Sequence, residues 1–269
     1  LRSSALIVKV KSVSFPFGDI FCTTISTFIE FIDRGLKIEA ATPGLSFTPI
    51  KETFASLLVD EKNDAWDVAT GNGQVAVELA EQFKQVLATD LSAEQLAEAP
   101  KNDNITYRVQ TAEAPFENAT KFDLITVAQA IHWFDFEAFY KNVQDHLKPD
   151  GIFAMIGYSV FETSGKLNEV IQHFYKDITD PYWDPERKYL DDHYKTIPFP
   201  FKEIQTPKLQ MNVFWNKDQF LNYLNTWSAV KHYEKANGQN PLELIQDDVD
   251  RSWGNAVTRK FSFPLLFRV

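Results

Sequence analysis

The sequence predicts an α/β fold: a doubly wound parallel sheet with helices on both faces. Short apolar runs at residues 65–69, 86–90, 105–109, 122–128 and 152–158 are separated by segments in which apolar residues recur at helical spacing. The fourth run is apolar at almost every position, as expected for a strand covered on both faces. Strands that alternate with helices in this way pair in parallel.

The first 45 residues fit this pattern poorly. Residues 1–18 contain an apolar, β-branched run that could form a strand or a loose arm. From Asp19 to Gly35 the apolar residues fall on one helical face, which predicts a helix that packs on the main domain or covers a ligand. Thr48 and Pro49 predict the start of the next helix, with a hydroxyl N-cap and a proline in the first turn.

A glycine-containing turn follows the first predicted strand. Gly71 and Gly73 allow positive φ and keep side chains away from a ligand. A helix predicted from Gln74 would direct its N-terminal N–H groups at whatever occupies this turn. The second apolar run ends in Asp90, where a βαβ unit places a carboxylate that binds ribose hydroxyls. The stretch therefore predicts a nucleoside site.

Capping signals place the next helices. Ser92-x-x-Gln95 predicts a capping box for a short helix. Asp135 predicts the N-cap of a helix over residues 136–147, and residues 148–151 are expected to end it before the fifth strand.

After residue 158 the alternation of strands and helices stops. Ser164 predicts the start of one helix, the Asn216-x-x-Gln219 box a second, and Asn240-Pro241 a third. The final residues alternate as a half-buried strand, which Pro264 places at or near a sheet edge.

Composition limits the classes of function. The chain has 269 residues, 44% of them hydrophobic, and a formal charge of −10, which argues against a nucleic-acid backbone as partner. The single cysteine, Cys22, cannot form an internal disulfide and favours a reducing compartment. No apolar stretch is long enough to span a bilayer. We expect a cytoplasmic protein with no nucleic-acid or membrane partner.

Several further motifs follow one another in a characteristic order: Asp67 before the glycine turn, Asp90-Leu91-Ser92, Gln110 to Phe116, Phe122 to Ile125, Gln129 to Phe134, and Leu147 to Gly151. This order resembles the class I S-adenosylmethionine-dependent methyltransferases, and within them the small-molecule branch related to trans-aconitate methyltransferase. The resemblance covers residues 64–158 well, continues loosely to the C-terminus and is poor before residue 45. Gly71-x-Gly73-x-x-Ala76 also satisfies the dinucleotide fingerprint, so an NAD(P)-dependent oxidoreductase is the alternative.

The resemblance implies a three-layer αβα, Rossmann-like fold. Its mostly parallel, seven-stranded sheet would have an antiparallel pair region at one edge and a helical insertion after the fifth strand. One methyltransferase domain would then span the chain, with residues 1–45 as an N-terminal arm or cap, 46–158 as the cofactor-binding core, 159–230 as a substrate lid, and 231–269 as a C-terminal helix and last strand.

Cofactor contacts are transferred from the family position by position. Asp67 would face the methionine amino group of S-adenosyl-L-methionine, although an acceptor for the turn is the simpler alternative. Asp90 would bind the ribose, and Ala112 with Glu113 would lie at the adenine, Glu113 being otherwise a surface residue. The complete predicted cofactor set is Asp67, Ala69, Thr70, Gly71, Gly73, Asp90, Leu91, Ala112, Glu113 and Gln129.

His132 is the candidate catalytic residue. Its imidazole could act as general base, could hydrogen-bond the substrate, or could be structural, and a carboxylate acceptor would need no base. Acceptor contacts are expected from the aromatic segment after the fifth strand, where core packing is the alternative for each ring. The predicted substrate-binding set is Trp133, Tyr158, Tyr175, Arg187, His193 and Trp227.

The sequence thus predicts methyl transfer to a small molecule, at a carboxylate or hydroxyl oxygen, by a monomer or homodimer. No metal is expected, because no His, Cys or carboxylate group has ligand spacing. Residues 41–46 lack the Arg-Pro-x-Tyr-Pro segment typical of the family, which leaves a non-catalytic nucleoside-binding protein as an alternative. Methylation of a protein side chain is a further one.

Overall fold

The computed structural model describes residues 62–117, 119–206 and 208–269. Several predictions lie outside these residues: the N-terminal arm, the helix from Asp19, the helix start at Thr48, the departure at residues 41–46, and Cys22.

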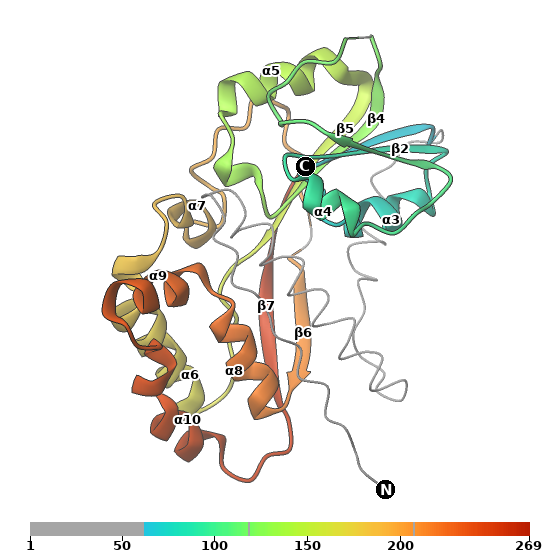
Figure 1. The fold of residues 1–269 in the computed structure, drawn as a ribbon. Coiled ribbons are helices and arrows are strands. Elements are labelled where there is room, and N and C mark those ends of the chain that lie inside the picture. The colour runs from blue at the N-terminus through green and yellow to red at the C-terminus, as the bar shows by residue number, and fades with distance from the viewer. Residues whose placement is uncertain (1–61, 118, 207) are drawn as a thin grey trace, which may run out of the picture.

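A seven-stranded sheet organises the described chain, in the order β3-β2-β1-β4-β5-β7-β6 (Figure 1). The first five strands pair in parallel, and β7 is antiparallel to both of its neighbours. The predicted mixed sheet is therefore confirmed. The strands are β1 (Asp64–Val68), β2 (Gln85–Asp90), β3 (Ile105–Val109), β4 (Phe122–Ala128), β5 (Leu147–Tyr158), β6 (Gln210–Trp215) and β7 (Arg259–Arg268).

Helices cover both faces of the parallel part of the sheet. Alternate residues of each strand point to opposite faces, and both faces carry apolar side chains that the helices bury. On one face, Ala65 and Leu124 pack with α3 (Gln74–Ala80). On the other, Trp66 and Ile125 pack with α5 (Phe136–His146). The short helix α4 (Ala93–Ala97) follows β2. These layers bring the carboxyl ends of β1, β2 and β4 to one edge, where open α/β sheets bind ligands.

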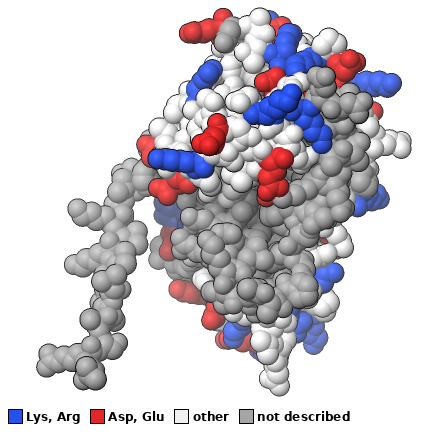
Figure 2. All heavy atoms as spheres, turned by 90° about the vertical axis from the view of Figure 1, so that its right-hand side faces the viewer, with Lys and Arg blue, Asp and Glu red and all other residues white. Residues whose placement is uncertain are grey.

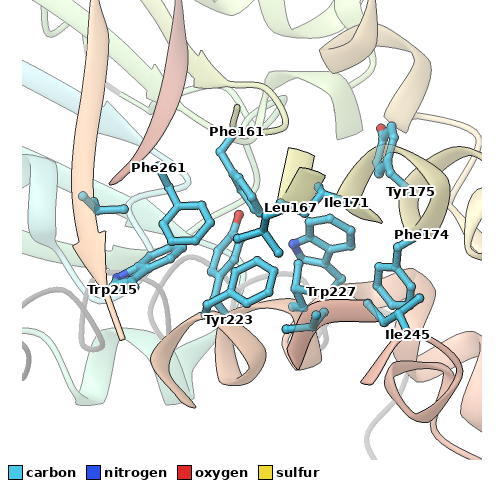
Figure 3. Packing of buried hydrophobic residues seen from close by; sticks show 14 of the residues in the cluster. Phe161, Leu167, Ile171, Phe174, Tyr175, Trp215, Tyr223, Trp227, Ile245 and Phe261 are labelled. Atoms are coloured by element: carbon cyan, nitrogen blue, oxygen red, sulfur yellow. The ribbon is translucent and has the colours of Figure 1, made fainter. Parts of the chain in front are cut away.

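The chain after β5 forms a helical unit with its own core, beside the long strands β6 and β7 (Figure 1). Figure 3 shows this core, in which Phe161, Trp215 and Phe261 meet Tyr223 and Trp227. Its helical elements are α6 (Lys166–His173), η2 (Phe174–Ile178), η3 (Asp180–Tyr182), α7 (Arg187–Asp191), α8 (Lys217–Asn225), α9 (Ser228–Asn237), η4 (Pro241–Leu244) and α10 (Gln246–Trp253). A helical insertion after the fifth strand was predicted, and the unit confirms it.

Two boundaries in the core differ from the sequence prediction. The fifth strand begins at Leu147, because residues 148–151 bulge beside β4, and Lys148 binds the Asp123 carboxylate at 2.8 Å. The Ser92 side chain caps α4 as predicted, but the Ser92 N–H donates to Asp90, so the reciprocal half of the box is not formed.

Two further elements differ after the fifth strand. Helix α6 starts at Lys166 after Gly165, not at Ser164. The Asn240 side chain caps the next element by accepting from the Leu242 N–H. That element is the 3-10 turn η4 followed by α10, where a single helix was predicted.

The last strand lies one position inside the sheet, near the edge as predicted. Residues 259–264 of β7 pair with β6, and residues 265–268 pair with β5. Pro264 stands where the partner changes, so its missing N–H interrupts neither ladder. The alternation of buried and exposed side chains along β7 also shifts by one residue here, since Phe263 and Leu266 are both buried.

The described part of the face in Figure 2 carries both basic and acidic side chains. Within residues 62–269, where described, no helix is long and apolar enough to cross a membrane.

Candidate active site

The turn after β1 has the geometry that the glycines predict. The Thr70 N–H donates to the Thr89 carbonyl at 2.9 Å, and the Gly73 N–H donates to the Thr70 carbonyl at 3.0 Å. Gly73 has φ of +85°, and a Cβ there would lie 2.5 Å from the Tyr107 hydroxyl oxygen. Gly71 also has positive φ. A side chain at Gly73 would therefore displace Tyr107 and strain the turn.

Asp67 is buried beneath this turn. It is 1% exposed, and its carboxylate accepts from the Thr70 hydroxyl at 2.5 Å and from the Thr126 hydroxyl at 2.8 Å. Burial raises its pKa to about 6, against the lowering effect of these hydrogen bonds. Asp67 thus ties β1 to β4 and to the turn, as the structural alternative expected. Once Asp67 is ionised, its negative charge would strengthen the binding of a cation beside it.

Asp90 connects the turn to the end of β2. One carboxylate oxygen accepts from the Gly71 N–H and the other from the Ser92 N–H, both at 2.8 Å. A carboxylate can accept about four hydrogen bonds, so holding the turn and holding two ribose hydroxyls are compatible. The next residue, Leu91, is 66% exposed, which places an apolar surface beside this carboxylate.

Two neighbouring strands end in strained residues. Ala69 after β1 has φ of +53°, and Gln129 after β4 has φ of +56°. Left-handed geometry is costly for residues other than glycine and clusters at functional sites. The Gln129 side chain accepts from the Tyr158 N–H at 2.9 Å and donates to the Tyr158 carbonyl at 3.3 Å. Gln129 thereby joins the cofactor edge to the end of β5.

The loop after β3 closes the predicted cofactor edge. Ala112 is buried, and its carbonyl accepts from the Asn142 amide of α5 at 2.9 Å. Glu113 is half-buried and accepts from the Asp135 N–H at 3.2 Å. Glu113 is therefore attached to the start of α5 and is not a freely solvated surface residue.

A cavity lies between the strand ends and the helical unit. It combines polar groups from β4 and β5 with aromatic side chains that follow the fifth strand. Its lining residues are Gln129, His132, Tyr158, Ser159, Val160, Trp183, Arg187, Leu190, Tyr223, Trp227 and Ser228.

His132 lines this cavity from the 3-10 turn η1 (Ile131–Trp133). It is 3% exposed, and burial, together with the Arg187 charge, lowers its pKa to about 3. The ring is therefore neutral at pH 7 and a weak base. Its Nδ1 lies 3.4 Å from the hydroxyl oxygen of Tyr194. Tyr194 fits there because Gly157 has no side chain: a Cβ at residue 157 would lie 2.7 Å from its ring and hydroxyl.

Arg187 enters the cavity wall from α7. Its guanidinium carbon lies 4.6 Å from the ring centre of Trp183 and 5.4 Å from that of Tyr175. Its Nε donates to the Tyr175 hydroxyl at 2.9 Å and to Asp191 at 3.4 Å. The Tyr175 hydroxyl donates in turn to Asp191 at 2.6 Å. Stacking and hydrogen bonding together fix the guanidinium plane.

The predicted substrate residues separate into two groups. Tyr158, Arg187 and Trp227 line the cavity, and Tyr175 supports Arg187 from behind. Trp133 is 39% exposed and is not among the lining residues.

His193, a predicted substrate residue, does not lie among the described residues that line the cavity. It is exposed, with φ of +55°, because the turn after α7 directs the next residue, Tyr194, inward instead. Sequence reasoning missed Tyr194, Trp183, Leu190, Tyr223 and Ser228. Trp183 and Tyr194 stood within a segment recognised as aromatic, but no periodicity distinguished lining rings from packing rings.

The residues at the strand ends fit the predicted cofactor. The glycine turn keeps side chains away, Asp90 supplies a carboxylate, and exposed Leu91 supplies an apolar surface for a base. Among the described residues, no group of three His, Cys, Asp or Glu side chains could hold a metal ion.

Comparisons with known proteins agree with this geometry. Residues 66–155 match the family model described as a methyltransferase domain. A candidate methyltransferase of Dictyostelium discoideum is 33% identical over 214 residues, covering 77% of this chain and 81% of the relative. Methyltransferase cfoB of Aspergillus candidus is 26% identical, covering 74% and 71%.

A solved structure supports the same assignment. A candidate type II methyltransferase from Anaeromyxobacter dehalogenans is 31% identical, with a TM-score of 0.74, over 85% of this chain and 97% of that one. Identity at this level over most of both chains places the protein with the methyltransferases and not with the NAD(P)-dependent oxidoreductases. The chain belongs to the class I methyltransferases, whose methyl donor is S-adenosylmethionine.

Proposed function

We propose that the protein transfers the methyl group of S-adenosylmethionine to an oxygen atom of a small molecule bound in the cavity. The observation that carries the proposal is the lining of that cavity. Gln129 and His132 come from the strand ends that adjoin the cofactor turn, and Trp183, Arg187 and Trp227 come from the helical unit. An acceptor held between them would lie next to the cofactor edge.

A carboxylate oxygen is the acceptor atom that this wall suits best, with a hydroxyl as the second choice. A carboxylate is ionised at pH 7 and needs no general base, whereas a hydroxyl does. His132 is too weak a base for that task, given its lowered pKa. We therefore assign His132 to hydrogen bonding with the acceptor, oriented by Tyr194.

The cofactor would supply an electrophilic methyl group on a sulfonium. The new carbon–oxygen bond forms as the carbon–sulfur bond breaks, with the electron pair left on sulfur. The residues of this chain would align the acceptor oxygen with the methyl carbon and exclude water, which is where the rate gain of such a displacement arises. Asp90 and the glycine turn would fix the nucleoside, and Gln129 would couple that edge to the cavity.

Label transfer tests the proposal. The protein is incubated with methyl-labelled S-adenosylmethionine and a panel of small carboxylic acids, phenols and amines, and products are separated by chromatography. We expect label in the ester of at least one acid. Tight cofactor binding without transfer to any acceptor would favour the non-catalytic alternative. Label incorporated into protein from a cell extract would favour a protein side chain as acceptor.

A further inference from the structure

Arg187 lines the cavity and has hydrogen-bond donors that no described residue uses. Its Nε is engaged by Tyr175 and Asp191, whereas its two Nη groups make no hydrogen bond to any residue that the structure describes. The stacked rings of Tyr175 and Trp183 hold the guanidinium plane. The paired Nη groups form a fork of the kind that binds a carboxylate with two parallel hydrogen bonds.

Trp183 contributes a second, independent donor. Its indole Nε1 is buried and has no acceptor among the described residues. An indole N–H can only donate, and leaving a buried donor unsatisfied costs free energy. Trp183 and Arg187 line the same cavity. Both groups would therefore be satisfied by a ligand that carries acceptors and negative charge.

The rest of the wall defines the body of that ligand. Among the lining residues that the structure describes, Arg187 is the only charged one. Asp191 pairs with Arg187 on its Nε side, and Asp184 accepts from the Ser228 hydroxyl at 3.1 Å, so neither carboxylate accepts a hydrogen bond from the two Nη groups. The remaining surface is largely aromatic, from Tyr158, Tyr223 and Trp227.

We propose that Arg187 and Trp183 form an anion subsite and that the acceptor is a monocarboxylic acid with a flat, apolar body. The proposal rests on the methyl-transfer function argued above and names its substrate class. The two Nη groups can hold one carboxylate. Among the described lining residues there is no second cation, so a second carboxylate would be buried against aromatic rings at a high cost in free energy. Di- and tricarboxylic acids should therefore bind more weakly than monocarboxylic acids.

The subsite also gives a reason for product release. Methylation converts the bound carboxylate into a neutral ester, which cannot pair with the Arg187 charge. The ester should consequently bind more weakly than the acid, so that the product leaves and the next acid enters.

Calorimetry on the full chain saturated with S-adenosylhomocysteine tests the substrate class. Benzoate and cinnamate are each compared with the corresponding amide and methyl ester, and benzoate with terephthalate. At least one monocarboxylate should bind roughly 10-fold or more tightly than its amide, its ester and its dicarboxylate. If neither acid binds more tightly than its amide, or if terephthalate matches benzoate, the proposal is wrong.

Variants of neighbouring residues test the assignment to Arg187. Arg187→Gln should weaken acid binding roughly 10- to 100-fold and leave amide binding unchanged, and Arg187→Lys should recover part of the loss. Lys188→Gln is the matched control, because it removes the same charge from an exposed side chain that does not line the cavity. Equal effects at residues 187 and 188 would overturn the proposal.

The ligands separate this proposal from the function on which it rests. Failure of S-adenosylhomocysteine to bind would contradict the proposed function. Binding of S-adenosylhomocysteine with no preference for acids would contradict the anion subsite alone. The comparison of acid and amide uses the unaltered protein, so it holds even if an Arg187 variant folds poorly.

Discussion

Replacing Asp67 by Asn should change how stability depends on pH. Burial raises the pKa of Asp67 from 3.8 to about 6. Each pKa unit corresponds to about 1.4 kcal/mol, so ionising Asp67 in the folded protein costs about 3 kcal/mol relative to the unfolded chain. The folded protein keeps this proton to a higher pH than the unfolded chain does. The free energy of unfolding is therefore expected to fall as pH rises from 3.8 to about 6, and to stay lower above that.

Urea unfolding at several pH values measures this effect. Between about pH 4.5 and pH 7.5 the wild type should lose about 2 kcal/mol of stability relative to Asp67→Asn, since part of the titration lies below that range. Asn is a close isostere, and the Thr70 and Thr126 hydroxyls can rotate to suit its amide. A difference between wild type and variant that stays constant within about 0.5 kcal/mol, or that shifts in favour of the wild type as pH rises, would refute the argument.

Three further predictions test the site. Asp90→Ala should weaken binding of S-adenosylmethionine by roughly 1.5–3 kcal/mol, the range for hydrogen bonds to a charged group; an unchanged dissociation constant in a folded variant would contradict this. Gly157→Ala should lower the free energy of unfolding by about 1–3 kcal/mol through overpacking against Tyr194, and Tyr194→Leu should recover part of that loss; simple additivity would argue against the contact. His193→Ala should leave the acceptor KM within about threefold. Tyr175→Ala removes the support of Arg187 and should raise the acceptor KM at unchanged cofactor affinity. An equal rise in KM for both variants would show that His193 reaches the acceptor.

The sequence was most informative where local pattern and tertiary environment agree. The glycine turn, the ends of β1, β2 and β4, and the Asn216 capping box all formed as predicted. Asp67 and Asp90 were found where their motifs placed them. These features depend on φ angles, on apolar runs and on side chains that cap nearby N–H groups, all of which are determined over a few residues.

The features that the sequence did not predict depend on tertiary contacts and on backbone turns without a sequence signal. β6 has no strong strand pattern and forms because it pairs with β7, about fifty residues later. His193 and Tyr194 look equally suited to a polar pocket, and only the backbone turn after α7 decides which one faces His132. Arg187 was among the predicted substrate residues, but its pairing with Trp183 was not predicted, because it arises from ring stacking within the helical unit that no spacing rule encodes.

Calorimetry with the two kinds of nucleoside cofactor tests the account most directly. The glycine turn, Asp90 and Leu91 form the edge that should hold the nucleoside. S-adenosylmethionine and S-adenosylhomocysteine are predicted to bind the wild-type chain with micromolar-class affinity, and NAD should give no measurable heat at the same concentrations. Binding of NAD in preference to both sulfur nucleosides would contradict the account.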